Sequence, residues 1–506
     1  MTQERLDQKT FQSAGPSLIL QVLSQGTALV VGILMVRLLE PKDYGIWGIL
    51  IVFWQIGLIV AWGGLGSAII QKKDVDKHDL DSAFYYNMFI AGLLALALYL
   101  GSGWLADFFR QPVLKDVTRL VAWGLPIAAL GAVQHALLCR KMRQDLSSLA
   151  SFIGQIAAVP PALYIAWKGY GVWALAWQMF IAQGVATLTV FCFCRWLPGF
   201  KFRFKVLGGM FQYGSNIMFA NLIDNIFNNA YNIIIGKVYP ITTLGFYERG
   251  RQYSSVWPQS VQMTIGSVLF AAFSKIQDNV TRLRNAVVES LKMSVFIVFF
   301  PSLLIAALAV PFVSLILSEK WLPIVPYFQV LTLSFVVFPI YYLNLQILNA
   351  RGRSGIYLGL ISLNKLFVVI NILCTVWISV MALVWGMVVV SFISLYFNTR
   401  YTKRVLGYGL RAQLWDSLPY LIYSLIASGA AYGLYLLLWD INHWLGLLAP
   451  LATGCVVYLL LNVFCYSPAF DTAWRLAKEQ FHQWRQKKSD DQTEQPNEEM
   501  QERGGR

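Results

Sequence analysis

Charged side chains are scarce in this sequence. Only 13% of its 506 residues are charged, whereas 57% are hydrophobic. A soluble protein of ordinary composition carries roughly 25% charged residues, so this composition excludes a soluble globular protein. Histidine and cysteine are also few, at four and six residues. They are scattered and show no CxxC spacing, so we expect neither a disulfide scaffold nor a metal site.

Long apolar runs fill the chain instead. Each is long enough to cross about 30 Å of hydrocarbon, and none shows the strict alternation of barrel strands. Spans of this kind must be helical, so the predicted fold class is an all-α polytopic membrane protein. Residues 1–16 are polar, and we expect no cleavable signal peptide before the first span. Fourteen spans are predicted near 17–36, 46–70, 83–105, 117–138, 148–167, 172–194, 211–236, 252–273, 287–316, 324–348, 355–378, 381–399, 414–438 and 444–466.

The positive charges orient these spans. If the N-terminus is cytoplasmic, 28 of the 40 Lys and Arg residues fall in cytoplasmic segments, eight on the other side and four at or inside spans. Because positive charge collects on the cytoplasmic side, this split predicts an even number of spans with both termini cytoplasmic. The net charge of +14 follows from this topology, so it does not indicate nucleic acid. The basic loops can also contact anionic membrane lipids.

An internal repeat appears when the chain is aligned with itself at an offset of 200 residues. Arg37 then falls on Lys237 and Gly45 on Gly245. Six spans in each half would make the halves a parallel repeat, related by an axis along the membrane normal. We therefore expect two pseudo-symmetric six-helix lobes and two C-terminal helices: an N-lobe at 1–194, a basic cytoplasmic linker at 195–210, a C-lobe at 211–400, spans thirteen and fourteen within 401–466, and a cytoplasmic tail at 467–506. The tail ends in polar, acidic sequence, so disorder is expected, with partner docking as the alternative.

A polar stripe interrupts the seventh span. Its members are spaced three and four residues apart, which places them on one side of a helix: Asn221, Asp224, Asn225, Asn228 and Asn232. At the offset of 200, three residues of the first span align with the start of this stripe: Gln21, Ser24 and Gln25. We expect both stripes to line one cavity shared by the two halves. The alternative is that the amides only join helices, at about 0.6 kcal/mol each.

Carboxylates inside spans are by default functional candidates. Asp224 is the first candidate for coupling transport to an ion, and Glu289 is the second. The coupling ion would be Na⁺ or H⁺, and we expect no other cofactor.

Several segments resemble one family. VRLLEPKDYGIWGI (36–49) resembles the segment after the first span of Wzx-type polysaccharide flippases. WGGLGSAIIQKKDVDKHDLDSAFYYN (62–87) and SVLFAAFSKIQDN (267–279) are similar to two further motifs of that family, with Ala271 where proline is expected and Lys275 where arginine is expected. The subgroup resembled is that of colanic acid and teichuronic acid exporters. Beyond residue 280 the resemblance depends on the span count and on LNARGRS (348–354).

The resemblance implies the fourteen-helix fold of the multidrug, oligosaccharidyl-lipid and polysaccharide exporter superfamily. It implies a transporter, not an enzyme, that turns a polyprenyl-pyrophosphate-linked oligosaccharide from the inner to the outer leaflet of a bacterial inner membrane. Alternating access would come from rocking of the two lobes. A polysaccharide polymerase or export machinery would be the partner.

A diphosphate cargo needs cations, and four lie at or inside spans: Arg249, Arg251, Lys292 and Lys365. Arginine binds phosphate oxygens in a bidentate fashion, which favours the first two. The structural alternatives are that Glu248 pairs with Arg251 or Lys292, and that the lysines pair with Glu289 or Asp224. Arg37 and Lys237 are interpreted as anchors of helix ends. Four aromatic residues are candidates for stacking on sugars, or equally for the membrane interface: Tyr231, Tyr247, Tyr253 and Trp257.

Three other classes of protein compete with this interpretation. A multidrug or lipid II flippase of the same superfamily would share the fold but not the cargo. A polysaccharide polymerase or ligase needs a large outward loop, whereas the longest predicted here has about a dozen residues, near 104–116. No arrangement of catalytic residues is visible in the sequence either. A receptor or scaffold has no positive signal.

Overall fold

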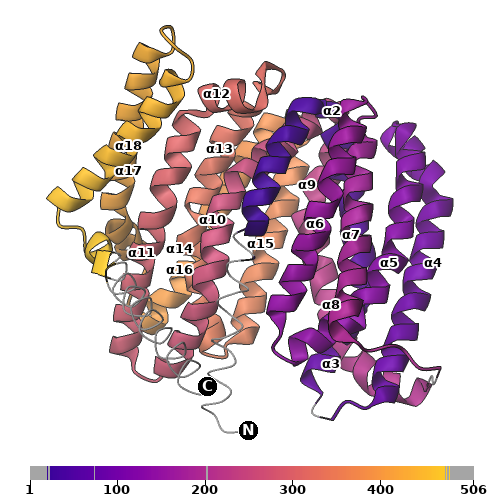
Figure 1. Cartoon of the computed structure of the whole chain (residues 1–506). Coiled ribbons are helices and arrows are strands. Elements are labelled where there is room, and N and C mark those ends of the chain that lie inside the picture. Colours follow the sequence, from indigo (N-terminus) through magenta and orange to yellow (C-terminus); the bar gives the residue numbers. More distant parts are fainter. Residues whose placement is uncertain are drawn as a thin grey trace, which may run out of the picture. The chain divides into compact units, whose positions relative to one another are not determined.

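The computed structural model describes residues 23–72, 74–200 and 203–472, with isolated residues beyond them at 20, 474, 475 and 478. Gln21 and most of the tail expected at 467–506 lie outside the described residues. Within the described ranges every regular element is helical (Figure 1). The predicted all-α class is therefore confirmed.

Eleven helical segments are long and apolar enough to cross a membrane within the described part of the chain. They are α2 (Pro41–Trp62), α4 (Lys77–Phe109), α5 (Val113–Arg140), α6 (Gln144–Trp167), α7 (Val172–Cys194), α11 (Val280–Ala307), α13 with α14 (Ile324–Val336 and Phe338–Ala350), α15 (Ser354–Thr375), α16 (Val380–Leu406), α17 (Leu410–Leu438) and α18 (Leu445–Phe464). The protein is thus a multi-pass membrane protein.

The other predicted spans also fall on helices. The first coincides with the helix Leu23–Leu38, the seventh with α8 (Phe204–Asn228) and α9 (Ala230–Val238), and the eighth with α10 (Ile241–Ile276). These helices are shorter or less apolar than the eleven. That all fourteen cross the membrane stays a prediction. Shorter elements are α3 (Leu65–Gln71), α12 (Ala309–Phe312), the π-turn η1 (Val313–Leu317) and the 3₁₀ turn η2 (Glu319–Trp321).

The second predicted span, 46–70, is two helices in the structure. Pro41 opens α2 and a capping box stabilises its first turn, where an Asp43 carboxylate oxygen accepts the backbone N–H of Glu40 at 3.0 Å. Gly63 and Gly64 then take left-handed φ angles of 53° and 67°, which end α2 and begin α3. Glycine adopts this conformation without steric cost, and an apolar run does not reveal the break.

Packing divides the chain into two compact units. The first unit holds the chain to Gly250 with 316–327 and 372–383, and the second holds 251–315, 328–371 and the chain from Val384. Packing therefore joins α8, α9 and the start of α10 to the helices of the expected N-lobe, although the repeat assigned them to the C-lobe. The two lobes at 1–194 and 211–400, and their bounds, stay a prediction.

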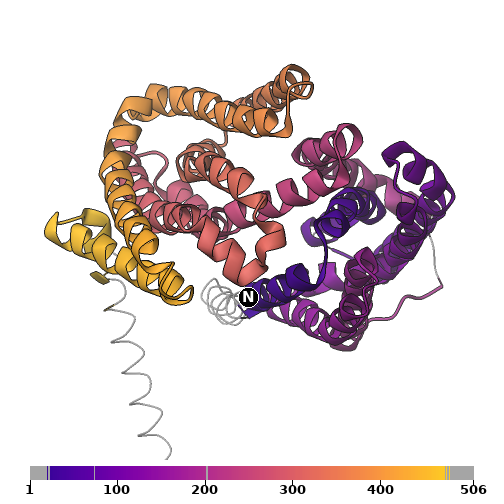
Figure 2. The same ribbon diagram turned by 90° about the horizontal axis from the view of Figure 1, so that it is seen from above.

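Each unit has its own apolar core. In the first, Leu65 and Ile69 of α3 pack on Phe84 of α4 and Val133 of α5. In the second, α11, α14 and α17 meet through residues such as Leu291, Ile347 and Tyr420. Helices α17 and α18, drawn in orange and yellow, lie side by side in both views (Figures 1 and 2).

One reciprocal contact inside the first unit agrees with the expected repeat. A Cβ added at Gly45 of α2 would collide with the carbonyl oxygen of Ile241, and one added at Gly245 of α10 would collide with the carbonyl oxygen of Pro41. The offset of 200 relates Pro41 to Ile241 and Gly45 to Gly245. A contact in which each member repeats the other is what a twofold relation produces. Only glycine allows the two backbones to approach this closely.

Arg37 and Lys237, which the offset also relates, both bind carbonyl groups near helix ends. Arg37 Nε donates to the carbonyl oxygen of Ile316 at 2.7 Å. Lys237 Nζ donates to that of Phe108 at 2.6 Å. Their interpretation as anchors of helix ends is confirmed.

Candidate functional site

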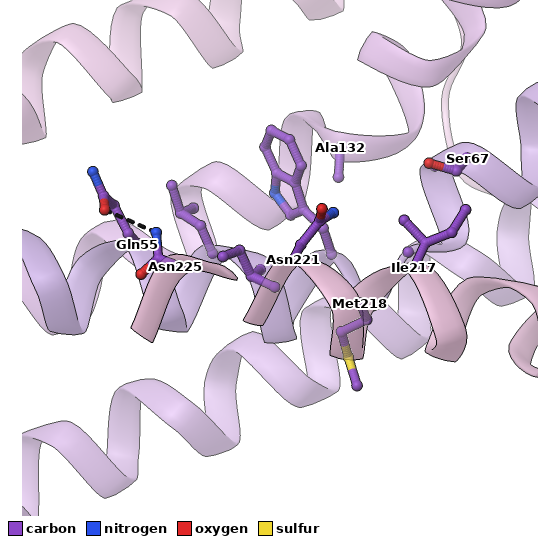
Figure 3. A pocket seen from close by; sticks show the side chains of 12 residues that line it. Gln55, Ser67, Ala132, Ile217, Met218, Asn221 and Asn225 are labelled. Carbon is purple, nitrogen blue, oxygen red and sulfur yellow. Dashed lines mark hydrogen bonds between the residues drawn. The ribbon is translucent and has the colours of Figure 1, made fainter. Parts of the chain in front are cut away.

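A cavity of about 380 Å³ lies within the first unit, between α2, α3, α5 and α8 (Figure 3). Polar, small and aromatic side chains share its wall. The lining residues are Gln55, Leu58, Ile59, Trp62, Gly64, Gly66, Ser67, Ala132, Ile217, Met218, Asn221 and Asn225. Among these described residues none carries a charge. The cavity therefore offers hydrogen-bonding groups and an indole ring without an ion.

The glycine break after α2 builds this cavity. A Cβ at Gly64 would collide with the backbone of Gly214 on α8, so the α2–α3 turn lies directly against that helix. This close approach brings the amide stripe of α8 alongside the second half of α2. The apolar residues of α3 pack against α4 and α5.

One glutamine organises the polar end of the cavity. Gln55 Oε1 accepts hydrogen bonds from Asn225 Nδ2 at 2.9 Å and from Asn229 Nδ2 at 3.1 Å. Asn229 also donates to the Asn225 carbonyl oxygen at 3.0 Å, where α8 ends. The amides of α8 are thus held by a residue of α2, and their orientation is set before any ligand arrives.

Other polar groups follow along the cavity. Figure 3 shows Gln55 and Asn225 at one end, Asn221 in the middle and Ser67 toward the other end. Asn221 is exposed, whereas Asn225 is half-buried. A ligand lying along the cavity would meet amide and hydroxyl groups in succession.

The remaining members of the stripe do not line this cavity. Asn228 Nδ2 donates to Asp224 Oδ2 at 2.8 Å, and both residues are exposed. Asn232 is fully buried, and its Nδ2 faces the carbonyl oxygen of Gly48 at 3.5 Å. The stripe therefore serves two purposes: Asn221 and Asn225 face a cavity, whereas Asn232 joins two helices.

The first-span residues lie elsewhere in the described part of the unit. Ser24 Oγ donates to Gln155 Oε1 at 2.8 Å, and Gln155 Nε2 donates to the Ser24 carbonyl oxygen at 3.3 Å. Gln155 lines a second cavity of about 170 Å³ with Trp47, Leu175, Gln178, Met179 and Ala182. Gln25 is exposed and lines neither cavity. A single cavity shared by both stripes stays a prediction.

The candidate cations are spread over both units. Within the first unit, the Arg249 guanidinium lies 3.9 Å from the ring centroid of Tyr44, a cation–π contact. Arg251 follows on the same helix but belongs to the second unit, as does the half-buried Lys365 of α15.

Lys292 has a partner that the sequence did not indicate. Its Nζ lies 3.4 Å from Asp416 Oδ1 of α17, a partner other than the expected Glu289 or Asp224. Glu289 is exposed on α11. Because α11 and α17 pack together, the fold brings into contact two residues 124 positions apart in the sequence.

The aromatic residue of the cavity is Trp62, not one of the four predicted. Tyr231 and Tyr247 are buried, Tyr253 packs on Phe312, and Trp257 Nε1 donates to a backbone carbonyl. Sequence reasoning also missed Gln55. A lone glutamine inside the apolar run 46–62 was the available signal, and Trp62 opens a glycine-rich motif.

Metal ligands do not gather in the described part of the chain: no three His, Cys, Asp or Glu residues lie together there.

The family of the chain follows from comparison with known proteins. A family model described as "Polysaccharide biosynthesis protein" matches residues 34–326. The chain belongs to this family. The match includes the motifs at 36–49, 62–87 and 267–279, so the predicted family is confirmed.

Several proteins of polysaccharide biosynthesis are similar to this chain in sequence. The succinoglycan biosynthesis transport protein ExoT of Rhizobium meliloti is 22% identical over 323 residues, covering 64% of this chain and 65% of that protein. The lipopolysaccharide biosynthesis protein WzxC of Escherichia coli is 24% identical, covering 64% and 67%. The teichuronic acid biosynthesis protein TuaB of Bacillus subtilis is 23% identical, covering 60% and 63%. The chain thus spans about two-thirds of the length of these relatives.

Solved structures show the same fold. The lipid II flippase MurJ, in an inward closed conformation, aligns with a TM-score of 0.72 at 15% identity, covering 89% of this chain and 98% of that one. An inward-facing multidrug transporter of the MATE family aligns with a TM-score of 0.57 at 15% identity, covering 78% and 94%. The fold is therefore shared with MurJ and with this MATE transporter.

Proposed function

We propose that this protein flips a polyprenyl-pyrophosphate-linked oligosaccharide across a bacterial inner membrane. The observation that carries the proposal is an uncharged, amide-lined cavity among membrane helices of a polysaccharide biosynthesis family. The protein acts as a transporter and not as an enzyme, by alternating access of two lobes. Both termini are cytoplasmic, and a polysaccharide polymerase or export machinery takes the product.

The cavity lowers the main energetic cost of flipping, which is the transfer of sugar hydroxyls into hydrocarbon. A sugar hydroxyl without a hydrogen bond in hydrocarbon costs several kcal/mol. Amide side chains both donate and accept hydrogen bonds, so they replace the water that each hydroxyl loses. The wall of the cavity supplies such groups on Gln55, Asn221 and Asn225.

The position of the cavity along its helices supports entry from the inner leaflet. With a cytoplasmic N-terminus, α2 runs inward from Pro41 to Trp62, and the cavity residues Gln55 to Trp62 occupy its inner half. The lipid-linked sugar starts in that leaflet, so the cavity would meet it early.

The diphosphate and the driving ion need other groups. Arg249, Arg251 and Lys365 are the proposed phosphate ligands, while the ion pair with Asp416 weakens the case for Lys292. Asp224, beside the cavity residues Asn221 and Asn225 in sequence, is proposed to couple transport to H⁺ or Na⁺, with Glu289 second. An Asp224→Asn variant should lose the dependence of flipping on that gradient. Full flipping with unchanged pH and sodium dependence would remove Asp224 from this role.

Deletion of the gene tests the function. We expect a lipid-linked oligosaccharide to accumulate on the cytoplasmic leaflet, and the purified protein in liposomes should move that lipid to the opposite leaflet. Accumulation of lipid II instead would assign the cargo to cell-wall synthesis. Accumulation of repeat units already on the outer leaflet would indicate a defect in polymerisation and overturn the proposal.

A further inference from the structure

We infer that the cavity of the first unit is a subsite for an uncharged sugar ring of the cargo, and that the diphosphate stays outside it. This inference rests on the proposed function and names the part of the lipid-linked oligosaccharide that each region holds. Four observations support it: the charge of the wall, its donors and acceptors, its preorganisation and its size.

The wall excludes an anion. None of the described lining residues is Lys, Arg or His, and none is Asp or Glu. A diphosphate entering the cavity would lose its hydration without gaining a cation, at a cost far greater than that of a neutral hydroxyl group. A sugar carrying a carboxylate would meet the same penalty. The ring held here is therefore uncharged.

The wall suits a polyhydroxyl ring. A sugar hydroxyl is both donor and acceptor, and so are the side chains of Asn221, Asn225 and Ser67 as a set. The indole of Trp62 adds a flat apolar face, against which the C–H face of a pyranose can pack. A lipid chain would leave the amides without partners, so acyl tails are poor occupants.

Gln55 preorganises the site. Its Oε1 accepts from both Asn225 and Asn229, which directs the oxygen of this amide toward α8. Figure 3 shows the Gln55 oxygen turned toward Asn225 and the nitrogen turned away from it. A fixed amide loses little conformational entropy when a sugar binds, so the site gains affinity from its rigidity.

The size limits the occupant. About 380 Å³ lies near the lower end of the range of roughly 300–1,000 Å³ for small-ligand pockets. The cavity admits a small saccharide but not a long oligosaccharide, so the rest of the repeat unit must extend from it.

The test compares two lipids on the full-length protein in nanodiscs by native mass spectrometry. One probe is undecaprenyl pyrophosphate, and the other is the oligosaccharide-linked form extracted from the deletion strain. We expect the wild type to bind the glycosylated lipid more tightly. Asn221→Ala should weaken binding of the glycosylated lipid about fivefold, and Gln55→Leu about tenfold, with the sugar-free lipid unaffected.

Two further variants sharpen the test. Gln178→Leu makes the same type of change in the second cavity, so it should leave both affinities unchanged. Asn221→Asp adds a charge without changing the shape of the side chain. It should weaken binding of the glycosylated lipid more than Asn221→Ala does. Asn221 is exposed, so neither of its variants should disturb folding.

Each outcome bears on a different claim. If the wild type binds neither lipid, the proposed function fails and the inference fails with it. If it binds and flips the glycosylated lipid but prefers it no more than the sugar-free lipid, the function stands and the sugar subsite is overturned. The subsite is also overturned if the Asn221 and Gln55 variants bind the glycosylated lipid as tightly as the wild type does. The same holds if these variants lose affinity for both lipids to the same extent.

Discussion

Two amide networks, one in each unit, use the same side chains differently. In the first unit Gln55 and Asn225 pair across α2 and α8 beside an open cavity. In the second, Asn344 and Gln413 donate to each other at 2.8 and 3.0 Å, and both are buried. Thr402 adds a further bond to Asn344 at 2.6 Å.

The difference shows what makes an amide a ligand group. In the second network the amide side chains hydrogen-bond to other groups of the protein. These bonds join α14, α16 and α17 and leave no donor or acceptor for a ligand. In the first network the pairing orients the amides while the cavity keeps one side accessible. Polar residues in membrane helices therefore serve packing or recognition according to what faces them.

An ion pair completes the contrast in the second unit. Tyr408 donates its hydroxyl to Asp416 Oδ2 at 2.7 Å, and Lys292 lies 3.4 Å from the other oxygen. Burial and then the hydrogen bond to Asp416 raise the pKa of Tyr408, so it remains a protonated donor at neutral pH. The group binds α11 to α17 and leaves Lys292 already engaged.

The largest loss of stability should follow Asn344→Leu. This change leaves the buried Oε1 of Gln413 without its donor, and we expect the free energy of unfolding to fall by about 2 kcal/mol. Thermal unfolding of the purified protein measures it. The double variant Asn344→Leu/Gln413→Leu should recover part of the loss because both partners become apolar. An unchanged melting temperature in the single variant would mean that this network is not structural glue.

Gln55→Leu should cost less stability and more function. The change frees the side-chain donor of Asn225 beside a cavity that water can enter, so we expect the free energy of unfolding to fall by about 1 kcal/mol. The rate of flipping in liposomes should fall several times more than the loss of folded protein alone would explain. If the loss of folded protein fully accounts for the slower flipping, Gln55 has a structural role like that of the amides in the second unit.

Lys292→Met separates a structural lysine from a phosphate ligand. We expect a loss of about 0.5–1 kcal/mol in stability, since the pair with Asp416 is about a quarter exposed. Binding of undecaprenyl pyrophosphate should be nearly unchanged, with Lys365→Met as the matched comparison. Loss of lipid binding at an unchanged melting temperature would restore Lys292 to the phosphate site.

Asn221→Ala should have the smallest effect on stability. The residue is exposed at the cavity, so the free energy of unfolding should change by less than about 0.5 kcal/mol. Flipping should nevertheless decline, because a sugar ligand loses one amide. A large drop in melting temperature would show that Asn221 packs as tightly as Asn344 does.

Local chemistry explains why much of this could be predicted. Apolar length identifies helices because an unpaired backbone cannot lie in hydrocarbon, so the all-α class and the family motifs were readable. The spacing of the stripe placed Asn221 and Asn225 on one face of a helix. The offset of 200 aligned Gly45 with Gly245, and in the structure both glycines lie in one reciprocal contact.

Partners between distant segments could not be predicted in the same way. Nothing near Lys292 in sequence indicates Asp416, and nothing near Asn225 indicates Gln55, because these pairs form only when separate helices pack. The break at Gly63–Gly64 was hidden by a continuous apolar run, although it places α3 against α8 and creates the cavity.

By itself, the sequence determined that the chain crosses a membrane many times and that one helix carries amides. Those properties depend on composition and spacing along single helices. Only the tertiary structure decided which amides face a cavity and which are sealed against each other. That choice depends on how closely neighbouring helices approach, and close approach is set by glycines and side chains from distant parts of the chain.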